Sequence, residues 1–441
     1  MSFKGQSIMK KISILIFFLT FNFQFFKAQN LYFPPIVGNT WDTLSPQTLN
    51  WCQPRIDSLY NYLQAKNTKS FIVLKNGKIV LEKYFGTYTA DSTFYWASAG
   101  KSLTAFLVGL AQQKGLININ NKVSQYIGVG WSSASLIKEN LITIKNLLQM
   151  TSGLNDSPIL PCVNEDTAKS CLTYLADAGT KWAYHTGAYK KNQDVVSNAA
   201  GLSYNSLTTS WVKTKIGMDG FWFNQVYNSK ARGMARFGLL ILNKGIWAND
   251  TLMKDTVYFK SMVNTSQNLN LAYGYLWWLN GKSTLMVPGS QIVLPGYLIP
   301  NAPADLFAAL GKNDQKIYIV PSEKLVVIRQ GNSAGNVASA LSNFDNSLWD
   351  YINKLNCTSS GLKELNLASQ INVFPNPAIN KINIETGLGI KSVLITDVLG
   401  CSAQLKLMNN VADLSFLSKG FYNLIIITDT GLRCSKKLII N

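Results

Sequence analysis

The sequence predicts an α/β fold of the α+β kind, with an antiparallel sheet flanked by helices, an all-helical lobe and a small C-terminal β-sandwich. Two β-rich stretches between Phe71 and Phe85 surround the turn Asn76-Gly77, which is typical of a β-hairpin. A second β-rich block begins at Leu306, and a third runs from Ile371 to the C-terminus. We therefore expect the main sheet to join strands that lie far apart in the sequence.

Helical segments flank the predicted strands. A helix-period segment from Leu49 to Ala65 precedes the hairpin, and a second helical run follows it and stops at Gly115. The later elements, in chain order, are the β-rich stretches Leu306–Leu310, Lys316–Val320 and Leu325–Gln330, with Pro321-Ser322 as a turn, and the helix Val337–Leu355. We expect the first and last helices to cover one face of the sheet, and the insert from Leu116 to about Pro300 to form the helical lobe. A cleft between the two parts is the natural place for a site.

Composition narrows the class of protein. A chain of 441 residues allows two or three domains, and its 47% hydrophobic content is enough for sizeable cores. The net charge of +18 is spread along the chain without a long basic run, and no nucleic-acid-binding signature accompanies it. We interpret it as diffuse surface charge and expect no nucleic-acid partner.

The N-terminal segment resembles an export signal. The basic pair Lys10-Lys11 precedes an apolar run from Ile12 to Phe26, and Ala28 offers a small residue before a cleavage site. We predict a signal peptide over residues 1–28. A membrane anchor is the alternative, which the short and interrupted apolar run disfavours.

Six cysteines in an exported chain suggest disulfides. Cys52 and Cys357 lie at ends of the first and last predicted helices, which would meet if those helices pack antiparallel. Cys162 and Cys171 bracket a short polar loop, and Cys401 and Cys434 are available to pair in the tail. The alternative for each pair is free thiols. Because no C-x-x-C pair is present, we expect no metal site, and no cofactor is indicated.

The segment Ser98-Ala99-Gly100-Lys101 is the candidate for chemistry. At positions i and i+3 of a helix the two side chains share a face, so a desolvated lysine amine can accept the serine proton. The pattern opens a helical run, where free N–H groups favour negative charge. Further Ser-x-x-Lys matches lack this context and begin at Ser7, Ser135, Ser210 and Ser360.

Two other chemistries fit less well. The chain contains one histidine, His185, so a two-histidine metal site is impossible and a Ser-His-Asp hydrolase would have to use that residue. The alternative of a phosphate-binding loop ending in Gly100-Lys101-Ser102 needs a glycine where Tyr95 stands.

Residues 40–356 resemble the penicillin-recognising serine hydrolases, specifically the class C β-lactamase-related group with its esterases and the 6-aminohexanoate-dimer hydrolase. The segments that carry the resemblance, in chain order, are Trp96–Ser102, Leu147–Leu154, Gly179–Tyr184, Tyr273–Trp278, Gly311–Gln315 and Tyr318–Pro321. The resemblance implies a β-lactamase-like serine hydrolase domain, placed at residues 29–358.

The resemblance also implies roles for individual residues. Ser98 becomes the nucleophile, with Lys101 and Tyr184 as the groups that move its proton; Tyr184, between Lys101 and a second cation, is expected to have a depressed pKa. Tyr184-His185-Thr186 matches the family's Tyr-x-Asn motif except that Thr186 replaces the asparagine, which favours simple esters or amides over β-lactams.

The third family motif aligns with residues 312–314. Lys312 is expected to supply a positive field. Asn313 and Asp314 are expected to line the substrate site, with Asp314, in place of a glycine, either narrowing the site or neutralising Lys312. The backbone N–H groups of Ser98 and Gln315 are expected to form the oxyanion hole.

The C-terminal region changes character. Residues 359–369 have the composition of a linker, and residues 370–441 resemble the C-terminal sorting domain of type IX secretion substrates. The resemblance implies the type IX secretion machinery as a partner and a secreted or cell-surface location. The alternative is an adhesive or sugar-binding β-module.

Together these patterns predict an exported serine hydrolase that cleaves small esters or amides through an acyl-enzyme on Ser98. The first alternative is a penicillin-binding or sensing protein with little or no turnover, motivated by Thr186 and Asp314. The second is a surface adhesin that uses an inert hydrolase fold.

Overall fold

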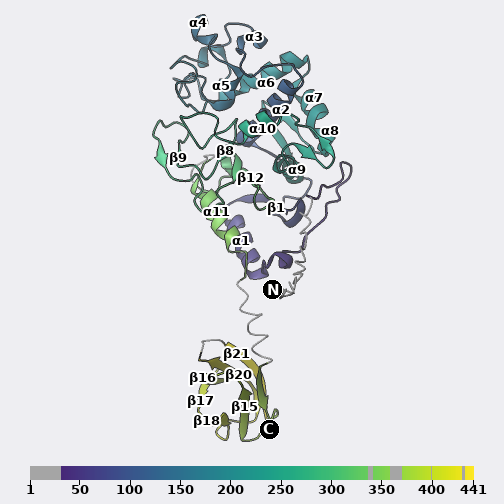
Figure 1. Ribbon diagram of the computed structural model, residues 1–441, viewed down its shortest axis with the longest axis vertical. Helices are drawn as coiled ribbons and strands as arrows, with labels where there is room; N and C mark the ends of the chain where they lie inside the picture. The colour runs from purple at the N-terminus through teal and green to yellow at the C-terminus, as the bar shows by residue number, and fades with distance from the viewer. Residues whose placement is uncertain (1–30, 336–340, 358–369, 399, 430–432) are drawn as a thin grey trace, which may run out of the picture.

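The computed structural model describes residues 31–335, 341–357, 370–398, 400–429 and 433–441 (Figure 1). The predicted signal peptide and linker, residues 1–28 and 359–369, lie outside the described residues. Within them, no helix has the length and apolar character needed to cross a membrane.

A six-stranded antiparallel sheet, in the order β2-β1-β13-β12-β11-β8, forms the centre of the first domain. Its strands are β1 (Thr68–Lys75), β2 (Lys78–Tyr84), β8 (Trp278–Leu279), β11 (Phe307–Gly311), β12 (Gln315–Val320) and β13 (Leu325–Gly331). The predicted hairpin is confirmed: Asn76 (φ 53°) and Gly77 (φ 82°) both adopt the left-handed conformation that a two-residue hairpin turn requires. Because β1 pairs with β13, the two ends of the domain are joined in one sheet.

The first and last helices, α1 (Gln53–Ala65) and α11 (Asn343–Asn353), pack together on one face of this sheet, as predicted. Tyr62 of α1 stacks on Tyr351 of α11, with ring centroids 4.4 Å apart. Tyr318 of β12 faces α11 through an edge contact with Trp349. The neighbouring residue Ile317 therefore points to the opposite face, because side chains alternate along a strand.

Both helices are shorter than predicted. Pro46–Leu49 is a separate 3-10 turn, and Asn50 in the left-handed conformation (φ 58°) separates it from α1. At the other end, Ser342 caps the first turn of α11 with its hydroxyl, so the helix begins at Asn343. Of the predicted first turn of this helix, residues 337–340 lie outside the described residues.

The insert between the strands departs from the all-helical lobe that was predicted. Its helix α9 (Ala231–Leu242) packs on the main sheet, where Gly238 lies so close that a Cβ atom would be 2.6 Å from Val326. The small antiparallel sheet β3-β5-β4 combines β3 (Thr93–Tyr95), which precedes the insert, with β4 (Phe221–Phe223) and β5 (Val226–Lys230) inside it. Period-based prediction missed this sheet because its strands are three to five residues long.

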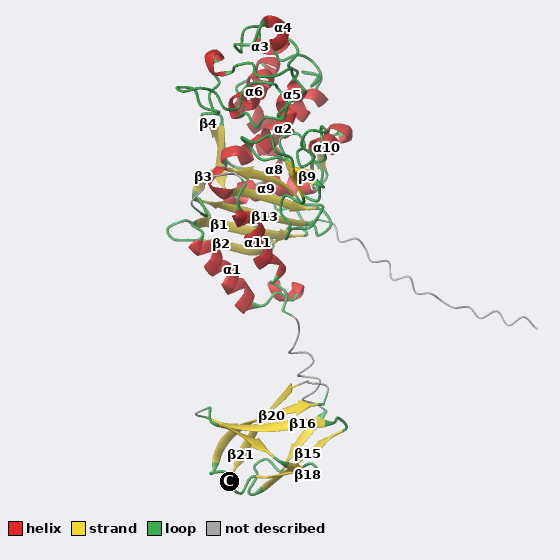
Figure 2. Ribbon diagram, turned by 90° about the vertical axis from the view of Figure 1, so that its left-hand side faces the viewer, coloured by secondary structure: helices red, strands yellow, loops and turns green. Residues whose placement is uncertain are grey.

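The remaining elements of the region between β3 and β12 are mostly short. Its α-helices are α2 (Gly100–Gln113), α3 (Ser124–Ile127), α4 (Leu136–Glu139), α5 (Ile144–Gln149), α6 (Thr186–Ala200), α7 (Tyr204–Thr208), α8 (Thr214–Ile216) and α10 (Thr256–Met262), with a π-helical turn Thr209–Lys213 and 3-10 turns Ala97–Ala99, Lys169–Cys171 and Lys312–Asp314. Its paired short strands are β6 (Ile246–Trp247) with β7 (Asp250–Thr251), and β9 (Thr284–Leu285) with β10 (Leu294–Pro295). Figure 2 shows these helices gathered on the far side of the sheet from α1.

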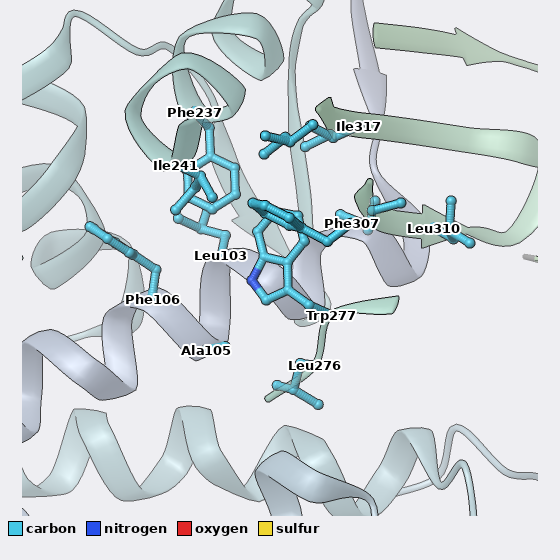
Figure 3. Packing of buried hydrophobic residues seen from close by; sticks show 14 of the residues in the cluster. Leu103, Ala105, Phe106, Phe237, Ile241, Leu276, Trp277, Phe307, Leu310 and Ile317 are labelled. Carbon is cyan, nitrogen blue, oxygen red and sulfur yellow. The ribbon is translucent and has the colours of Figure 1, made fainter. Parts of the chain in front are cut away.

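The buried indole of Trp277 joins the sheet to the helices behind it (Figure 3). Its ring stacks on Phe237 of α9 at 6.3 Å and meets the edge of Phe307 of β11 at 5.2 Å. Leu103 of α2 belongs to the same apolar cluster. Helix α2 packs against β11, and its Phe106 meets the edge of Phe237 of α9 at 6.2 Å, so that close packing fixes the position of its first turn.

Residues from Ile371 onward form a second domain with its own apolar core. Two four-stranded antiparallel sheets, β14-β15-β19-β18 and β17-β16-β20-β21, enclose a cluster that includes Ile384, Leu424 and Ile426. The strands are β14 (Ile371–Phe374), β15 (Lys381–Thr386), β16 (Ile390–Asp397), β17 (Ser402–Leu405), β18 (Leu407–Met408), β19 (Val411–Asp413), β20 (Gly420–Thr428) and β21 (Arg433–Ile440). The predicted small β-sandwich is confirmed.

Two of the three predicted disulfides are present. Cys52 bonds Cys357, and Cys162 bonds Cys171. The prediction for Cys401 and Cys434 is wrong. Cys401 precedes β17 at one edge of its sheet and is exposed, whereas Cys434 is buried on β21 at the other edge, with two strands between them. At about 4.8 Å per strand the thiols are out of bonding reach.

We expect the Cys52–Cys357 disulfide to make a large contribution to stability, because it closes a segment with a sequence separation of 305 residues. The double variant Cys52→Ala/Cys357→Ala should lower the free energy of unfolding of the first domain by about 2–5 kcal/mol in urea denaturation. Cys401→Ala, which removes an exposed thiol outside any disulfide, is the control and should leave the transition unchanged. Equal midpoints for the double variant and the wild type would contradict the expectation.

Candidate active site

Ser98 lies in a tight turn between β3 and α2. Ala97 before it adopts a left-handed backbone conformation (φ 48°), which an alanine rarely does, so the turn stores strain at the candidate nucleophile. Trp96 is fully buried and fixes the turn: its backbone N–H donates to the Tyr227 carbonyl at 2.8 Å, and its indole N–H donates to the Ser229 hydroxyl at 2.8 Å. The Ser98 side chain is thereby held, half-buried, at the start of α2.

Lys101 reaches back to Ser98 as the spacing predicts. Its Nζ lies 2.7 Å from Ser98 Oγ and 3.3 Å from Thr186 Oγ1. The amine also lies over two aromatic rings, 4.3 Å from the centroid of Tyr189 and 5.0 Å from that of Tyr184. Among the described residues no carboxylate forms an ion pair with it.

The burial of Lys101 changes the pKa of its amine. Loss of hydration, together with the nearby charge of Lys190, lowers the pKa of Lys101 to about 7, while the Glu165 carboxylate acts in the opposite direction. Near neutral pH a substantial fraction of this amine is uncharged and can accept the Ser98 proton.

The Tyr184 phenol behaves differently from the sequence-based expectation. Burial raises the pKa of Tyr184, and its interaction with Ser98 offsets this only in part. The ring is enclosed by other aromatic side chains: it stacks on Trp278 at 5.7 Å and meets Tyr273 edge-on at 6.2 Å. The prediction of a depressed pKa is wrong because desolvation outweighs the interaction with Ser98. The cation that lowers the pKa of Lys101 is Lys190.

His185 and Thr186 start helix α6. The His185 ring is buried, and its Nδ1 accepts a hydrogen bond from the Ala188 N–H at 3.4 Å, so it caps the helix. Burial lowers the pKa of His185 to about 4, which keeps the imidazole neutral in this role. Thr186 presents its hydroxyl to Lys101, in the place predicted for a substrate contact.

Strand β11 runs directly beside the Ser98 turn, and Gly311 permits this approach. A Cβ atom at Gly311 would lie 2.4 Å from the carbonyl oxygen of Trp96 and 3.0 Å from the backbone nitrogen of Ala99. No side chain fits there. The end of β11, immediately before the third motif, therefore lies against the Ser98 turn.

The residues that follow Gly311 divide between surface and core. Lys312 is exposed, and the Asn313 amide donates to the Tyr95 hydroxyl at 2.6 Å. Gln315 is fully buried at the start of β12, where it pairs with Gly311 across the hairpin. Lys312 follows Gly311 along the chain and Gln315 lies opposite it in the hairpin, so both backbone N–H groups are next to Gly311.

Asp314 points into the protein and not toward the substrate site. Its fully buried carboxylate lies 3.2 Å from Lys316 Nζ and accepts hydrogen bonds from the Ser342 hydroxyl at 2.7 Å and the Ala334 N–H at 3.0 Å. Lys316 in turn pairs with Asp345. Neither expectation for Asp314 holds: the carboxylate pairs with Lys316 instead of Lys312, and it supports the turn from behind.

Sequence reasoning missed three residues that shape this site. Tyr189 forms part of the aromatic enclosure of Lys101, and Lys190 adjusts its pKa. Asn164 binds the backbone on both sides of His185. Tyr189 and Lys190 follow the Tyr184 motif by one helical turn, which was a usable signal. Nothing in the sequence marks Asn164.

Comparison with known families agrees with this geometry. Residues 64–348 match the model of the β-lactamase family. The chain belongs to the β-lactamase family. Residues 372–441 match the secretion system C-terminal sorting domain, which indicates export to the cell surface or beyond.

Curated relatives are distant. An uncharacterized protein of Alkalihalophilus pseudofirmus is 21% identical over 308 residues, covering 60% of this chain and 84% of that protein. Protein flp of Staphylococcus aureus is 26% identical over 189 residues, 37% of either chain. The chain thus spans little more than a third of protein flp.

Solved structures share the β-lactamase-like fold. A Bacillus anthracis protein provisionally described as a 6-aminohexanoate-dimer hydrolase is similar with a TM-score of 0.54 and 19% identity, over 72% of this chain and 87% of that one. A penicillin-binding protein homolog from Caulobacter crescentus has a TM-score of 0.52 and 12% identity, over 69% and 98% of the two chains.

Removal of the Asp314 carboxylate should destabilise the fold, because it leaves Lys316 less well compensated in a site without water access. We expect Asp314→Ala to lower the free energy of unfolding by about 3 kcal/mol or more in urea denaturation. Asp305→Ala is the control: its carboxylate accepts from Ser322 on the exposed turn at the other end of the hairpin, and its loss should cost well under that. Similar losses for the two variants would contradict a buried role for Asp314.

Proposed function

We propose that this protein is an exported serine hydrolase that cleaves small esters or amides through an acyl-enzyme on Ser98. The observation that carries the proposal is the contact between the Lys101 amine, whose pKa is lowered to about 7, and the Ser98 hydroxyl. The two groups are 2.7 Å apart in a buried site. Membership of the β-lactamase family supports a serine hydrolase in general.

Acylation follows from the contacts of Ser98. The Oγ atom attacks the substrate carbonyl carbon while Lys101 Nζ takes its proton. The Tyr184 phenol, kept neutral by its raised pKa, donates its proton to the departing alcohol or amine and recovers one from Lys101. The bond to the leaving group breaks, and the acyl group remains as an ester on Ser98.

Deacylation reverses the proton path with water as the nucleophile. The water oxygen attacks the acyl carbon, and its proton passes to the Lys101 amine, which is again uncharged. The Ser98 oxygen leaves with a proton from the Tyr184–Lys101 pair, and the carboxylic acid is released. Each half-reaction uses the same groups in opposite roles.

The negative charge that develops on the carbonyl oxygen needs two donors. The Ser98 N–H, at the start of α2, is the first. For the second we proposed the Gln315 N–H from the sequence; the Lys312 N–H also flanks Gly311, the residue that contacts the Ser98 turn. Lys312, with its exposed side chain, would add a positive field at the entrance of the site.

Thr186 shapes the choice of substrate. Its hydroxyl is shared with Lys101, so this position offers no carboxamide to bind an acylamide group. Asn313 offers a polar edge but is engaged with Tyr95. We therefore favour small esters and simple amides over β-lactams. The C-terminal domain is proposed to act only in export, through recognition by the type IX secretion machinery.

We expect Ser98→Ala to lower kcat/KM for short-chain p-nitrophenyl esters by about 10³-fold or more, because the acyl-enzyme cannot form. The wild type should also be labelled by a fluorophosphonate on the Ser98 peptide. Ser210→Ala is the matched control, since Ser210-x-x-Lys213 repeats the spacing on an exposed helical turn. Ester turnover at the wild-type rate in Ser98→Ala would contradict the proposal.

The same panel separates the alternatives. Nitrocefin, an aminohexanoate dimer and D-amino-acid amides test the remaining substrate classes. A penicillin-binding or sensing protein would acylate once and show a burst without turnover. An inert adhesin would show neither labelling nor burst.

The activity should rise with pH on its acidic side as Lys101 loses its proton. With the pKa of Lys101 lowered to about 7, kcat/KM is expected to increase tenfold per pH unit well below 7 and to level off above it. His185 titrates near 4 and cannot produce this limb. A profile of kcat/KM between pH 5 and 9 measures this acidic limb, with a check that the enzyme stays folded where it is inactive. A flat profile across this range would contradict Lys101 as the base.

A further inference from the structure

One amide side chain binds the backbone on both sides of His185. The Nδ2–H of Asn164 donates to the Tyr184 carbonyl at 3.1 Å, and Oδ1 accepts from the Thr186 N–H at 2.8 Å. These two peptides carry the Tyr184 ring and the Thr186 hydroxyl, both of which contact Lys101. Asn164 therefore lies one contact away from every group that encloses the amine from this side.

The backbone of the same loop adds a second attachment. The carbonyl of Asn164 accepts from the Gly187 N–H at 2.7 Å. At Gly187 a Cβ atom would lie 1.8 Å from the Asp166 carbonyl oxygen, so the loop and the first turn of α6 touch backbone to backbone. The residue type at 187 is thus dictated by the loop.

The loop has little apolar packing of its own to hold it there. Ile159 and Leu160 are 88% and 81% exposed. It is held instead by polar and covalent links: the Asn164 amide donates to the Asp156 carbonyl at 2.6 Å, and the Cys162–Cys171 disulfide closes the segment on the far side. Loss of either link removes one of the restraints on Asn164.

The loop also arranges the charges around Lys101. The Glu165 carbonyl accepts from Lys190 Nζ at 2.9 Å, which sets the distance of that cation from Lys101. The titratable groups that face Lys101 are Tyr184, Tyr189, Lys190 and His185 from the motif and α6, and Glu165 from the loop. A displaced loop changes the positions of several of these at once.

We propose that Asn164 is a positioning residue for the hydrolysis, and that the Cys162–Cys171 disulfide keeps it in place. This inference rests on the proposed function of Ser98. Asn164 touches no reacting atom; it acts through Tyr184 and Thr186, whose placement determines whether water reaches the Lys101 amine.

Asn164→Ala tests the inference in the full-length chain. We expect kcat for a p-nitrophenyl ester to fall by about 10- to 100-fold with KM within about twofold, because the reacting groups lose alignment and not binding area. The acidic limb of the pH profile should move to higher pH, because water admitted beside Lys101 restores hydration of its charged form. Asn155→Ala is the matched control: its side chain accepts from the Ser157 N–H in a nearby turn, and among the described residues it forms no hydrogen bond with the Tyr184 motif.

The double variant Cys162→Ala/Cys171→Ala provides an independent measurement that keeps the Asn164 side chain. It should shift kcat and the acidic limb in the same directions by smaller factors, and it carries the test should Asn164→Ala not fold. Wild-type kcat and an unmoved limb in both variants would overturn the inference. Ser98→Ala is assayed in parallel: a wild type without Ser98-dependent turnover would overturn the proposed function, and this inference with it.

Discussion

The burial of one ammonium group is the constraint on which the site depends. Lys101 is enclosed by two tyrosine rings and a threonine hydroxyl, without a carboxylate partner among the described residues. Such an environment penalises the charged form, so the amine is kept close to deprotonation at neutral pH. Packing in the rest of the domain must offset the free energy that this burial costs, and the contacts around α2 contribute to it. Leu103 and Phe106 of α2 belong to the apolar cluster around Trp277, and Gly311 lets β11 reach the Ser98 turn.

The surroundings of the two buried lysines also explain their different roles. Lys101 and Lys316 are both buried lysines, yet Lys316 has two aspartates beside it and Lys101 has none. The site around Lys316 is a buried ion-pair cluster, whereas the site around Lys101 lowers the pKa of an amine that has no carboxylate partner among the described residues. Asp314, which replaces a glycine of the family motif, belongs to the first kind of site. Its presence therefore says little about substrate choice.

Much of the fold could be predicted from the sequence because its signals are local. The Asn76-Gly77 turn, the alternation of the strands and the helix that begins after Ser98 each depend on a few adjacent residues. Spacing and the family resemblance identified Ser98, Lys101, Tyr184 and Thr186, and the structure brings these side chains together.

The predictions that failed depend on contacts between residues that are mostly distant in sequence. The direction of the Asp314 side chain is set by Lys316, Ser342 and Ala334, and the pKa of Tyr184 by Trp278 and Tyr273. Local sequence patterns likewise do not predict the strand order that separates Cys401 from Cys434.

The loop that carries Asn164 connects the chemistry of the site to the compartment in which the protein works. Its closing bond is a disulfide, which forms in oxidising environments and not in the cytosol. The same chain carries a sorting domain for export. On the proposed mechanism, a chain still in the cytosol has a reduced loop, a loosely held Tyr184 motif and a Lys101 amine open to water. Full alignment of the base with Ser98 then follows export, because the bond that fixes Asn164 is made only along that route. On the proposed mechanism, the sorting domain and the disulfide impose the same condition on the proposed activity, one through location and the other through oxidation.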